Sequence, residues 1–360
     1  MTVEASIAER GADLAAKVRF LGRPDAYGLS QAPVVALETH MSWIFLAGER
    51  AYKLKKPVRF AYLDFSTLAL REAACRAELR LNRRLAPGVY LGVVPLTLGP
   101  AGLALGGTGE VVDWLVAMRR LDPAHALDIR LRNHVTDAEL GRLAERLARF
   151  YRHARPALIA PGSHLADWAQ ALADNRKVLL DPRLGLPHGL VRRIDAILRR
   201  FLRTERGLLV RRVLDRRILD AHGDLRPEHI WMDGPVRIID CLEFSAKLRA
   251  NDPLDEIAFL DLECERLGAP AVGRRIRTKV LRALHETEPE PLYSFYRCHR
   301  AMLRARLSIA HLLEAHPRQP AKWPGQARAY LALALRSAIT LERWLNRPGA
   351  RRAGDDGAGG

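Results

Sequence analysis

The sequence has no hydrophobic run of eighteen residues and is poor in cysteine. Without such a run, no transmembrane helix is predicted, and the 48% hydrophobic and 28% charged residues among 360 positions are typical of a globular protein with a substantial core. The four cysteines, Cys75, Cys241, Cys264 and Cys298, lie far apart and form no C-x-x-C pair. This spacing disfavours a zinc site or a disulfide framework, so we expect packing roles in a reducing compartment.

The first 22 residues contain acidic side chains and lack the apolar block of a secretory signal. Together with the lack of a predicted membrane segment, this favours a cytoplasmic location and no membrane partner.

Lysine is also scarce. Only eight of the 58 basic residues are lysine, so the net charge of +17 comes mainly from arginine. The arginines are scattered through helical segments rich in Ala, Leu and Arg, and do not form one basic tract with interleaved aromatic residues. This distribution favours a solvated surface and disfavours a nucleic-acid partner, with an acidic ligand such as a nucleotide, or a polyanion, as the alternative.

The N-terminal part of the chain has the pattern of a β-sheet with one helix. Short apolar runs broken by turn residues predict a β-meander over 33–65, and an apolar helical face follows over 66–85. Two more strands are predicted, at 90–98 and 111–121, joined by a glycine-rich turn. That turn has neither of the common phosphate-binding motifs, G-x-G-x-x-G and G-x-x-x-x-G-K.

From Asp137 onward the chain is predicted to be mainly helical, with one long helical stretch over 189–217. A short β interruption over 218–244 contains Asp233-Gly234, the signal of a two-residue hairpin turn. Helices resume over 253–345. The fold class is therefore α+β, with an antiparallel sheet and one helix followed by a mainly helical part.

We divide the chain into a nucleotide-binding lobe (1–119), a catalytic and substrate lobe (120–346) and a disordered tail (347–360).

The segment between His222 and Asp240 carries the residues that phosphoryl transfer needs. That reaction requires a base near the acceptor hydroxyl, carboxylates for magnesium and a cation on the nucleotide phosphates. Asp224 follows a glycine turn, His229 comes five residues later, and the hairpin leads to Asp240 after an apolar pair. The order matches the kinase pattern H-R-D-x-x-x-x-N followed by a magnesium-binding Asp.

The stretch from His222 to His229 resembles the catalytic loop of aminoglycoside phosphotransferases and of choline and fructosamine kinases. The resemblance extends over about 34–345 and points to an uncharacterised bacterial branch, some of whose members are fused to a P-loop kinase-like domain. It implies a protein-kinase-like two-lobed fold that uses ATP and Mg²⁺. It also implies that Asp224 is the base, that His222 supports the loop and that Arg226 contacts the transferred phosphoryl group.

The same resemblance assigns Asp240 to magnesium and places His229 where the family has a magnesium-binding Asn. Histidine is an uncommon ligand for this hard ion, which prefers oxygen. Three roles are open for His229. It could bind the metal, donate a hydrogen bond to phosphate or to Asp224, or have a structural role. Glu243 is either a further carboxylate for the metal or a surface acid at a strand end.

The lysine of the fold is expected on the third strand, paired with a glutamate on the helix. Lys53 in Ala51-Tyr52-Lys53 matches this position, and Lys55 on the same face is its alternative. Glu78 is the expected partner, with Glu72 as the alternative. The lysines could instead lie on a solvated edge strand, and either glutamate could form an i,i+4 ion pair on the surface.

Three further segments receive roles from the resemblance. The backbone around Met118, in 116–121, would contact the adenine ring, and the loop 39–42 would cover the phosphates unless it is an ordinary hairpin turn. Asp252-Pro253 is predicted to cap a helix that braces the catalytic loop. Aromatic and arginine residues of 293–300 would line a substrate pocket or form a helix-packing stripe.

The sequence therefore predicts an ATP-dependent phosphotransferase acting on a hydroxyl of a small molecule. A nucleotide-binding pseudokinase with a regulatory role is the main alternative, since His229 replaces an oxygen ligand. A protein kinase is disfavoured because neither D-F-G nor A-P-E is present. The pattern does not specify the acceptor or the oligomeric state.

Overall fold

The computed structural model describes residues 13–347 apart from 31, 61, 288–289 and 315–316. Most of the segment examined for a secretory signal, and the predicted tail except Arg347, lie outside the described residues. The chain forms two compact units, one made of residues up to Ala126 together with 229–248 and the other of 127–228 and the residues from Arg249 on. The segment 229–248 thus folds with the N-terminal strands, whereas our division at residue 119 assigned it to the second lobe.

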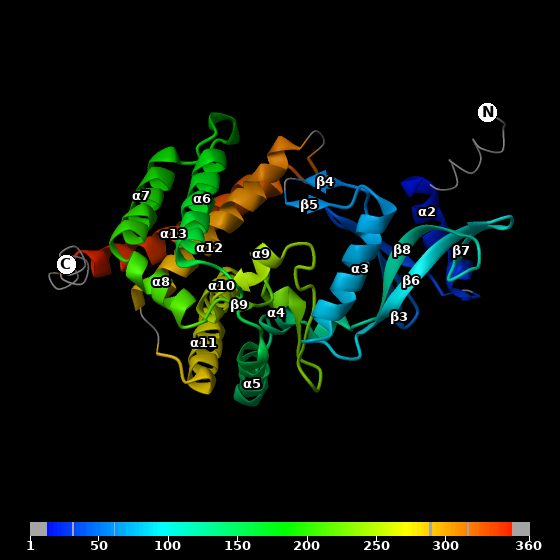
Figure 1. Ribbon diagram of the computed structural model, residues 1–360, viewed down its shortest axis with the longest axis horizontal. Helices are drawn as coiled ribbons and strands as arrows, with labels where there is room; N and C mark the ends of the chain where they lie inside the picture. The colour runs from blue at the N-terminus through cyan, green and yellow to red at the C-terminus, as the bar shows by residue number, and fades with distance from the viewer. Residues whose placement is uncertain (1–12, 31, 61, 288–289, 315–316, 348–360) are drawn as a thin grey trace. The chain divides into compact units, whose positions relative to one another are not determined.

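The first unit is built on a six-stranded antiparallel sheet with the strand order β1-β2-β3-β8-β6-β7. Four of these strands, β3, β6, β7 and β8, are labelled in Figure 1. The strands are β1 (Val35–Glu38), β2 (Ser42–Ala47), β3 (Arg50–Lys55), β6 (Tyr90–Gly99), β7 (Gly102–Leu105) and β8 (Glu110–Arg119). The predicted strands are present. The glycine-rich segment, however, is not one turn, because it contains the short strand β7.

Two helices pack on opposite faces of this sheet, α2 (Leu14–Leu21) and α3 (Leu68–Asn82). Successive residues of a strand point to opposite faces, so Tyr52 packs in one cluster with Leu21 of α2, while Ala51 packs in another with Cys75 of α3. Residues 53 and 55 share the α3 face with Ala51. A two-stranded ribbon, β4 (Arg59–Phe60) and β5 (Leu63–Asp64), completes this part of the chain.

The segment 229–248 adds the hairpin of β10 (Ile230–Trp231) and β11 (Arg237–Ile238) to the first unit. The register pairs Trp231 with Arg237, so five residues form the turn. The predicted two-residue turn at Asp233-Gly234 is therefore wrong, although Gly234 does adopt a positive φ of 69°.

The second unit is mainly helical. Its helices are α4 (Leu127–Arg130), α5 (Asp137–His153), α6 (Pro161–Leu179), α7 (His188–Thr204), α8 (Arg206–Leu214), α10 (Pro253–Arg266), α11 (Pro270–Leu284), α12 (Glu290–Ala310) and α13 (Lys322–Leu345). The short helix α9 (Ala246–Arg249) precedes strand β12 (Ala250–Asn251), which pairs with β9 (Leu219–Asp220). The predicted long helix over 189–217 is in fact two helices, α7 and α8, which break at Glu205.

Helix α10 is buried from Pro253 to Cys264. Asp252 caps it by accepting the Leu254 N–H group, with Pro253 in the first helical position as predicted. Buried carboxylates need compensating partners, and each acid of this stretch has one within the second unit. No helix in the described part of the chain is long and apolar enough to cross a membrane.

Candidate active site

Lys53 lies at the centre of the ion-pair network in the first unit. Its Nζ atom is 2.9 Å from Glu78 Oε1 on α3 and 2.9 Å from Asp240 Oδ1, which follows β11. Burial alone would lower the pKa of Lys53, but the carboxylates of Asp240 and Glu78 hold this pKa well above its ordinary value. The structure thus brings together the predicted lysine, the predicted glutamate and the predicted metal-binding aspartate.

Lys55 contacts the same glutamate from the next position on this face of β3. Its Nζ atom is 2.6 Å from Glu78 Oε2 and also binds Glu243. Burial by itself would raise the pKa of Glu78, but the ammonium groups of Lys53 and Lys55 outweigh it and keep this pKa below the usual range. Two cations on one carboxylate were not predicted, since Lys55 was only an alternative to Lys53.

Asp240 is held by its backbone while its side chain remains accessible. Its N–H group donates to Tyr90 Oη at 3.2 Å, and the next N–H group, of Cys241, donates to Asn82 Oδ1 at 2.9 Å. Asp240 has a φ of 63°, a left-handed conformation that Asp tolerates better than most residues. Its side chain is 46% exposed, in contrast to the buried Glu78.

One accessible carboxylate in this part of the molecule, that of Asp240, has the oxygen chemistry that a magnesium ion prefers. Mg²⁺ is commonly held by one or two carboxylates with water and substrate phosphates completing its shell, and the half-exposed carboxylate of Asp240 meets that requirement. Glu243 is already bound by Lys55. His229 is buried, and its Nε2 atom lies 3.6 Å from Asp240 Oδ2, so this imidazole faces the carboxylate.

The predicted catalytic loop lies in the second unit, immediately after β9. Gly223 has a φ of 91°, a conformation that side chains disfavour, which explains the glycine in His222-Gly223-Asp224. The Asp224 N–H group donates to His222 Nδ1 at 3.3 Å. The buried His222 side chain thus holds the backbone of Asp224, two residues further along the loop. Arg226 binds Asp224 Oδ2 at 3.1 Å and Glu228 Oε1 at 2.7 Å.

A buried glutamate on α10 anchors this loop. Glu256 accepts the N–H groups of His222 and Gly223 and the hydroxyl of Tyr151 at 3.0 Å. Burial raises the pKa of Glu256, although the hydrogen bonds from the N–H groups of Gly223 and His222 act to lower it. Its neighbour Asp255 is bound by Arg300 through two hydrogen bonds of 2.8 and 2.6 Å. We predicted that this segment braces the loop, but not that Glu256 is the residue in contact.

Other predicted residues have ordinary structural surroundings. Met118 is buried in β8, opposite Ala51 and Tyr90 in the sheet. Glu72 forms an i,i+4 pair with Arg76, which is the surface alternative that we gave for it. Thr39 closes the turn between β1 and β2 by hydrogen bonds with Ser42.

The aromatic residues predicted to line a substrate pocket or to pack α12 are buried. Phe295 stacks on Phe201, with ring centroids 4.4 Å apart, and the Tyr296 hydroxyl donates to Asp252. These contacts are those of helix packing, although Tyr293 and Arg297 also line a pocket of the second unit.

Sequence comparison finds relatives whose function is unnamed. The chain is 33% identical over 305 residues to uncharacterized proteins of Mycobacterium bovis and of two strains of Mycobacterium tuberculosis. The matched region covers 82% of this chain but 59% of each relative. The chain therefore spans little more than half the length of these relatives. No model of a known protein family matches it.

Structural comparison establishes the fold. The aminoglycoside phosphotransferase APH(2″)-IIia, in a complex with GDP and kanamycin, aligns with a TM-score of 0.52 and 16% identity over 86% of this chain and 95% of its own. A choline kinase from Cryptosporidium parvum aligns with a TM-score of 0.50 and 12% identity, covering 92% and 98% of the two chains. The chain has the fold of these small-molecule kinases, as predicted.

Proposed function

We propose that the chain is an ATP-dependent phosphotransferase that transfers the γ-phosphoryl group to a hydroxyl of a small molecule. The observation that carries this proposal is the position of Lys53, which binds both Glu78 and Asp240 at 2.9 Å. This triad has the composition that kinases use to hold nucleotide phosphates and magnesium. The kinase fold supports the same conclusion.

Each residue has a role that follows from its chemistry. Lys53 would neutralise the nucleotide phosphates, and the half-exposed carboxylate of Asp240 would hold Mg²⁺. Bound MgATP supplies the γ-phosphoryl group. Asp224 would orient the acceptor hydroxyl and accept its proton, and Arg226, which binds Asp224 Oδ2, would orient this carboxylate and contact the transferred group.

The test uses the purified chain with Mg²⁺, ATP or GTP, and a panel of sugars, amino alcohols and aminoglycosides. We expect nucleoside diphosphate to form together with a phosphorylated acceptor detected by mass spectrometry. Asp224→Asn should abolish turnover because the amide cannot accept the proton. Glu78→Gln should reduce it strongly, whereas Glu72→Gln, which changes only the exposed pair with Arg76, should not.

Two results would contradict the proposal. One is a folded protein that turns over neither nucleotide with any acceptor of the panel, and the other is an Asp224→Asn variant as active as the unmodified chain.

A nucleotide-binding pseudokinase is the second candidate, because a nitrogen ligand, His229, lies beside Asp240 where an oxygen donor would suit magnesium better. Nucleotide binding that does not depend on Mg²⁺, without turnover, would favour it. His229→Asn separates the two functions. A gain in Mg²⁺-dependent turnover would show that the histidine limits catalysis, and an unchanged lack of turnover would favour the pseudokinase.

A further inference from the structure

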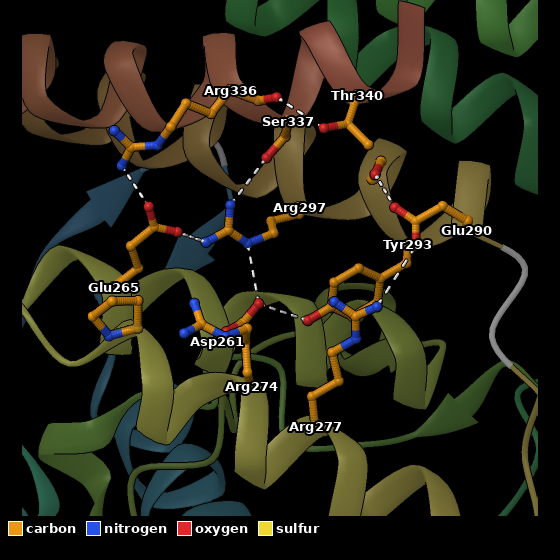
Figure 2. Close-up of a pocket in the computed structure, with 12 residues that line it drawn as sticks. Asp261, Glu265, Arg274, Arg277, Glu290, Tyr293, Arg297, Arg336, Ser337 and Thr340 are labelled. Carbon is orange, nitrogen blue, oxygen red and sulfur yellow. Dashed lines mark hydrogen bonds and ion pairs between the residues drawn. The ribbon is translucent and has the colours of Figure 1, made fainter. Parts of the chain in front are cut away.

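A pocket of about 230 Å³ opens in the second unit among helices α10, α11, α12 and α13 (Figure 2). Its lining residues include neither the loop at 222–226 nor the residues bound to Lys53. Compared with typical ligand sites of about 300–1,000 Å³, it suits a small ligand. It is therefore a candidate binding site separate from the proposed phosphotransfer chemistry.

Close packing of two helices places arginines over this pocket. A Cβ atom at Gly273 would come within 2.4 Å of Asp261 Oδ1, so α11 approaches α10 closely because residue 273 has no side chain. The next residue, Arg274, and Arg277 one turn further line the pocket. The guanidinium of Arg277 lies 3.9 Å from the centre of the Tyr293 ring, a cation–π contact that orients it (Figure 2).

Two of the three carboxylates that line the pocket, those of α10, are bound by arginines of α12 and α13. The third, Glu290, accepts the Ser294 hydroxyl at 3.1 Å and lies 3.6 Å from Arg277. Asp261 accepts the Tyr293 hydroxyl at 2.9 Å and Arg297 Nε at 3.2 Å, and Glu265 is bound by Arg297 and Arg336 (Figure 2). Burial would raise the pKa of Glu265, but Arg297 and Arg336 outweigh it and keep this pKa below its ordinary value. Arg297 and Arg336 are thus engaged with acids of α10.

Arg274 differs from these two arginines. Its guanidinium has no hydrogen bond or ion pair within the described part of the chain, and it is exposed. Four arginines and three carboxylates line the pocket, so the lining carries one net positive charge. The excess lies on α11, where Arg274 offers a planar set of N–H donors suited to carboxylate or phosphate oxygens.

We propose that this pocket binds a small oxyanion, a compound with a carboxylate or phosphate group, and that Arg274 is its principal contact. The acids of the lining repel such a ligand only weakly. Arg297, Arg336 and the Tyr293 hydroxyl compensate the two acids of α10, and Arg277 faces Glu290.

The test is calorimetric titration of the purified chain with inorganic phosphate and, separately, malonate, at an ionic strength kept constant with NaCl. We expect saturable binding of at least one, and the comparison distinguishes phosphate from carboxylate recognition. Arg274→Gln should weaken binding about tenfold or more, as expected for the loss of a charge-assisted contact. Arg275→Gln is the matched control. Arg275 is the next residue on α11, but its side chain binds Asp137 and does not line the pocket.

A Lys53→Met variant separates this site from the proposed nucleotide site, and it should bind the anion as the unmodified chain does. The inference is overturned if neither anion binds saturably at millimolar concentration, or if Arg274→Gln and Arg275→Gln weaken binding equally. It is also overturned if binding is lost in Lys53→Met and retained in Arg274→Gln.

Discussion

Lys53 and Lys55 both bind Glu78, but their surroundings differ. The side chain of Lys53 is 15% exposed and also binds the accessible Asp240, whereas that of Lys55 is 1% exposed and lies between Glu78 and Glu243. A buried charge is tolerated only when it is paired, so removal of one partner leaves the others uncompensated. We infer that Lys55 stabilises the fold and that Lys53 is the lysine available for a ligand.

Lys55→Met should therefore lower the free energy of unfolding by about 3 kcal/mol or more, because Glu78 and Glu243 lose a buried cation. Lys53→Met should destabilise the protein less but weaken nucleotide binding more. Urea unfolding and nucleotide titration of both variants measure the difference. Equal effects of the two substitutions on both properties would show that the lysines share one role.

The role of Glu256 as an anchor can be tested with two substitutions, one of Glu256 itself and one of its partner Tyr151. Glu256→Gln places an amide group against N–H groups that need an acceptor, and should cost about 1–3 kcal/mol of stability. Tyr151→Phe removes one hydrogen bond to the same carboxylate and should cost about 1 kcal/mol. Thermal unfolding measures both. A Glu256→Gln variant as stable as the unmodified chain would mean that the loop does not depend on this anchor.

Only part of the Lys53 network in the first unit and of the loop anchor in the second could be predicted from the sequence. Lys53, Asp224 and Asp240 lie in short motifs whose spacing is set by local backbone geometry. Glu256 lies in the segment 252–256 that was predicted to brace the loop, but the sequence did not show which residue makes the contact, because that depends on how α10 packs more than thirty residues later in the chain. The second cation on Glu78, Lys55, was missed for a similar reason. The two-residue spacing of Lys53 and Lys55 predicts that they lie on one face of the strand, but not that both bind the same glutamate.

At the scale of elements, local signals predicted helices better than they predicted breaks. Helix α3 begins at a Thr67 cap and has a clear apolar face, so its limits were nearly correct. The break between α7 and α8 falls at Glu205, with no proline, in a stretch whose apolar periodicity continues. Glu205 itself leaves the helical conformation, with a φ of −113° and a ψ of 18°, which apolar periodicity does not predict. Strand β7 was missed among glycines, although it pairs with the preceding strand β6 in a local hairpin.

Helix α5 offers a test of pH dependence. Its capping box pairs the Thr136 and Glu139 side chains with each other's N–H groups. Burial opposes ionisation of Glu139, but the hydrogen bonds from Thr136 and the charge of Arg130 prevail and lower its pKa. A lowered pKa in the folded state means that this stabilisation is present above pH 4.5, the ordinary value, and is lost as the pH falls through the folded-state pKa.

Glu139→Gln keeps the capping hydrogen bonds but cannot titrate. At pH 7 it should be less stable than the unmodified chain by up to about 1 kcal/mol, and the difference should shrink as the pH falls below 4.5. Urea unfolding at pH 7 and at acidic pH measures this difference. If the difference in stability between the two proteins stays constant with pH, the charge of Glu139 does not contribute to the cap.

At the scale of the whole molecule, the four cysteines report on global unfolding. All four are buried, and burial raises the pKa of Cys75 to about 12 and also raises that of Cys264 and Cys298. Because the thiolate is the reactive form, the native protein should react slowly with a thiol-specific reagent such as Ellman's reagent. In denaturant all four should react rapidly. Fast modification of a thiol in the native protein would reveal local opening near that residue.

The first unit is assembled from two separate stretches of chain, and this has a consequence for protein engineering. A fragment ending at residue 126 would keep Lys53, Lys55 and Glu78 but lose Asp240 and Glu243. Ala126, however, forms a β-bridge with Trp231, so the two stretches come together where the first one ends. A short glycine-rich tether from residue 126 to 229 would thus join them into one continuous polypeptide, a miniature protein in which the ion-pair network of Lys53 can be studied by itself.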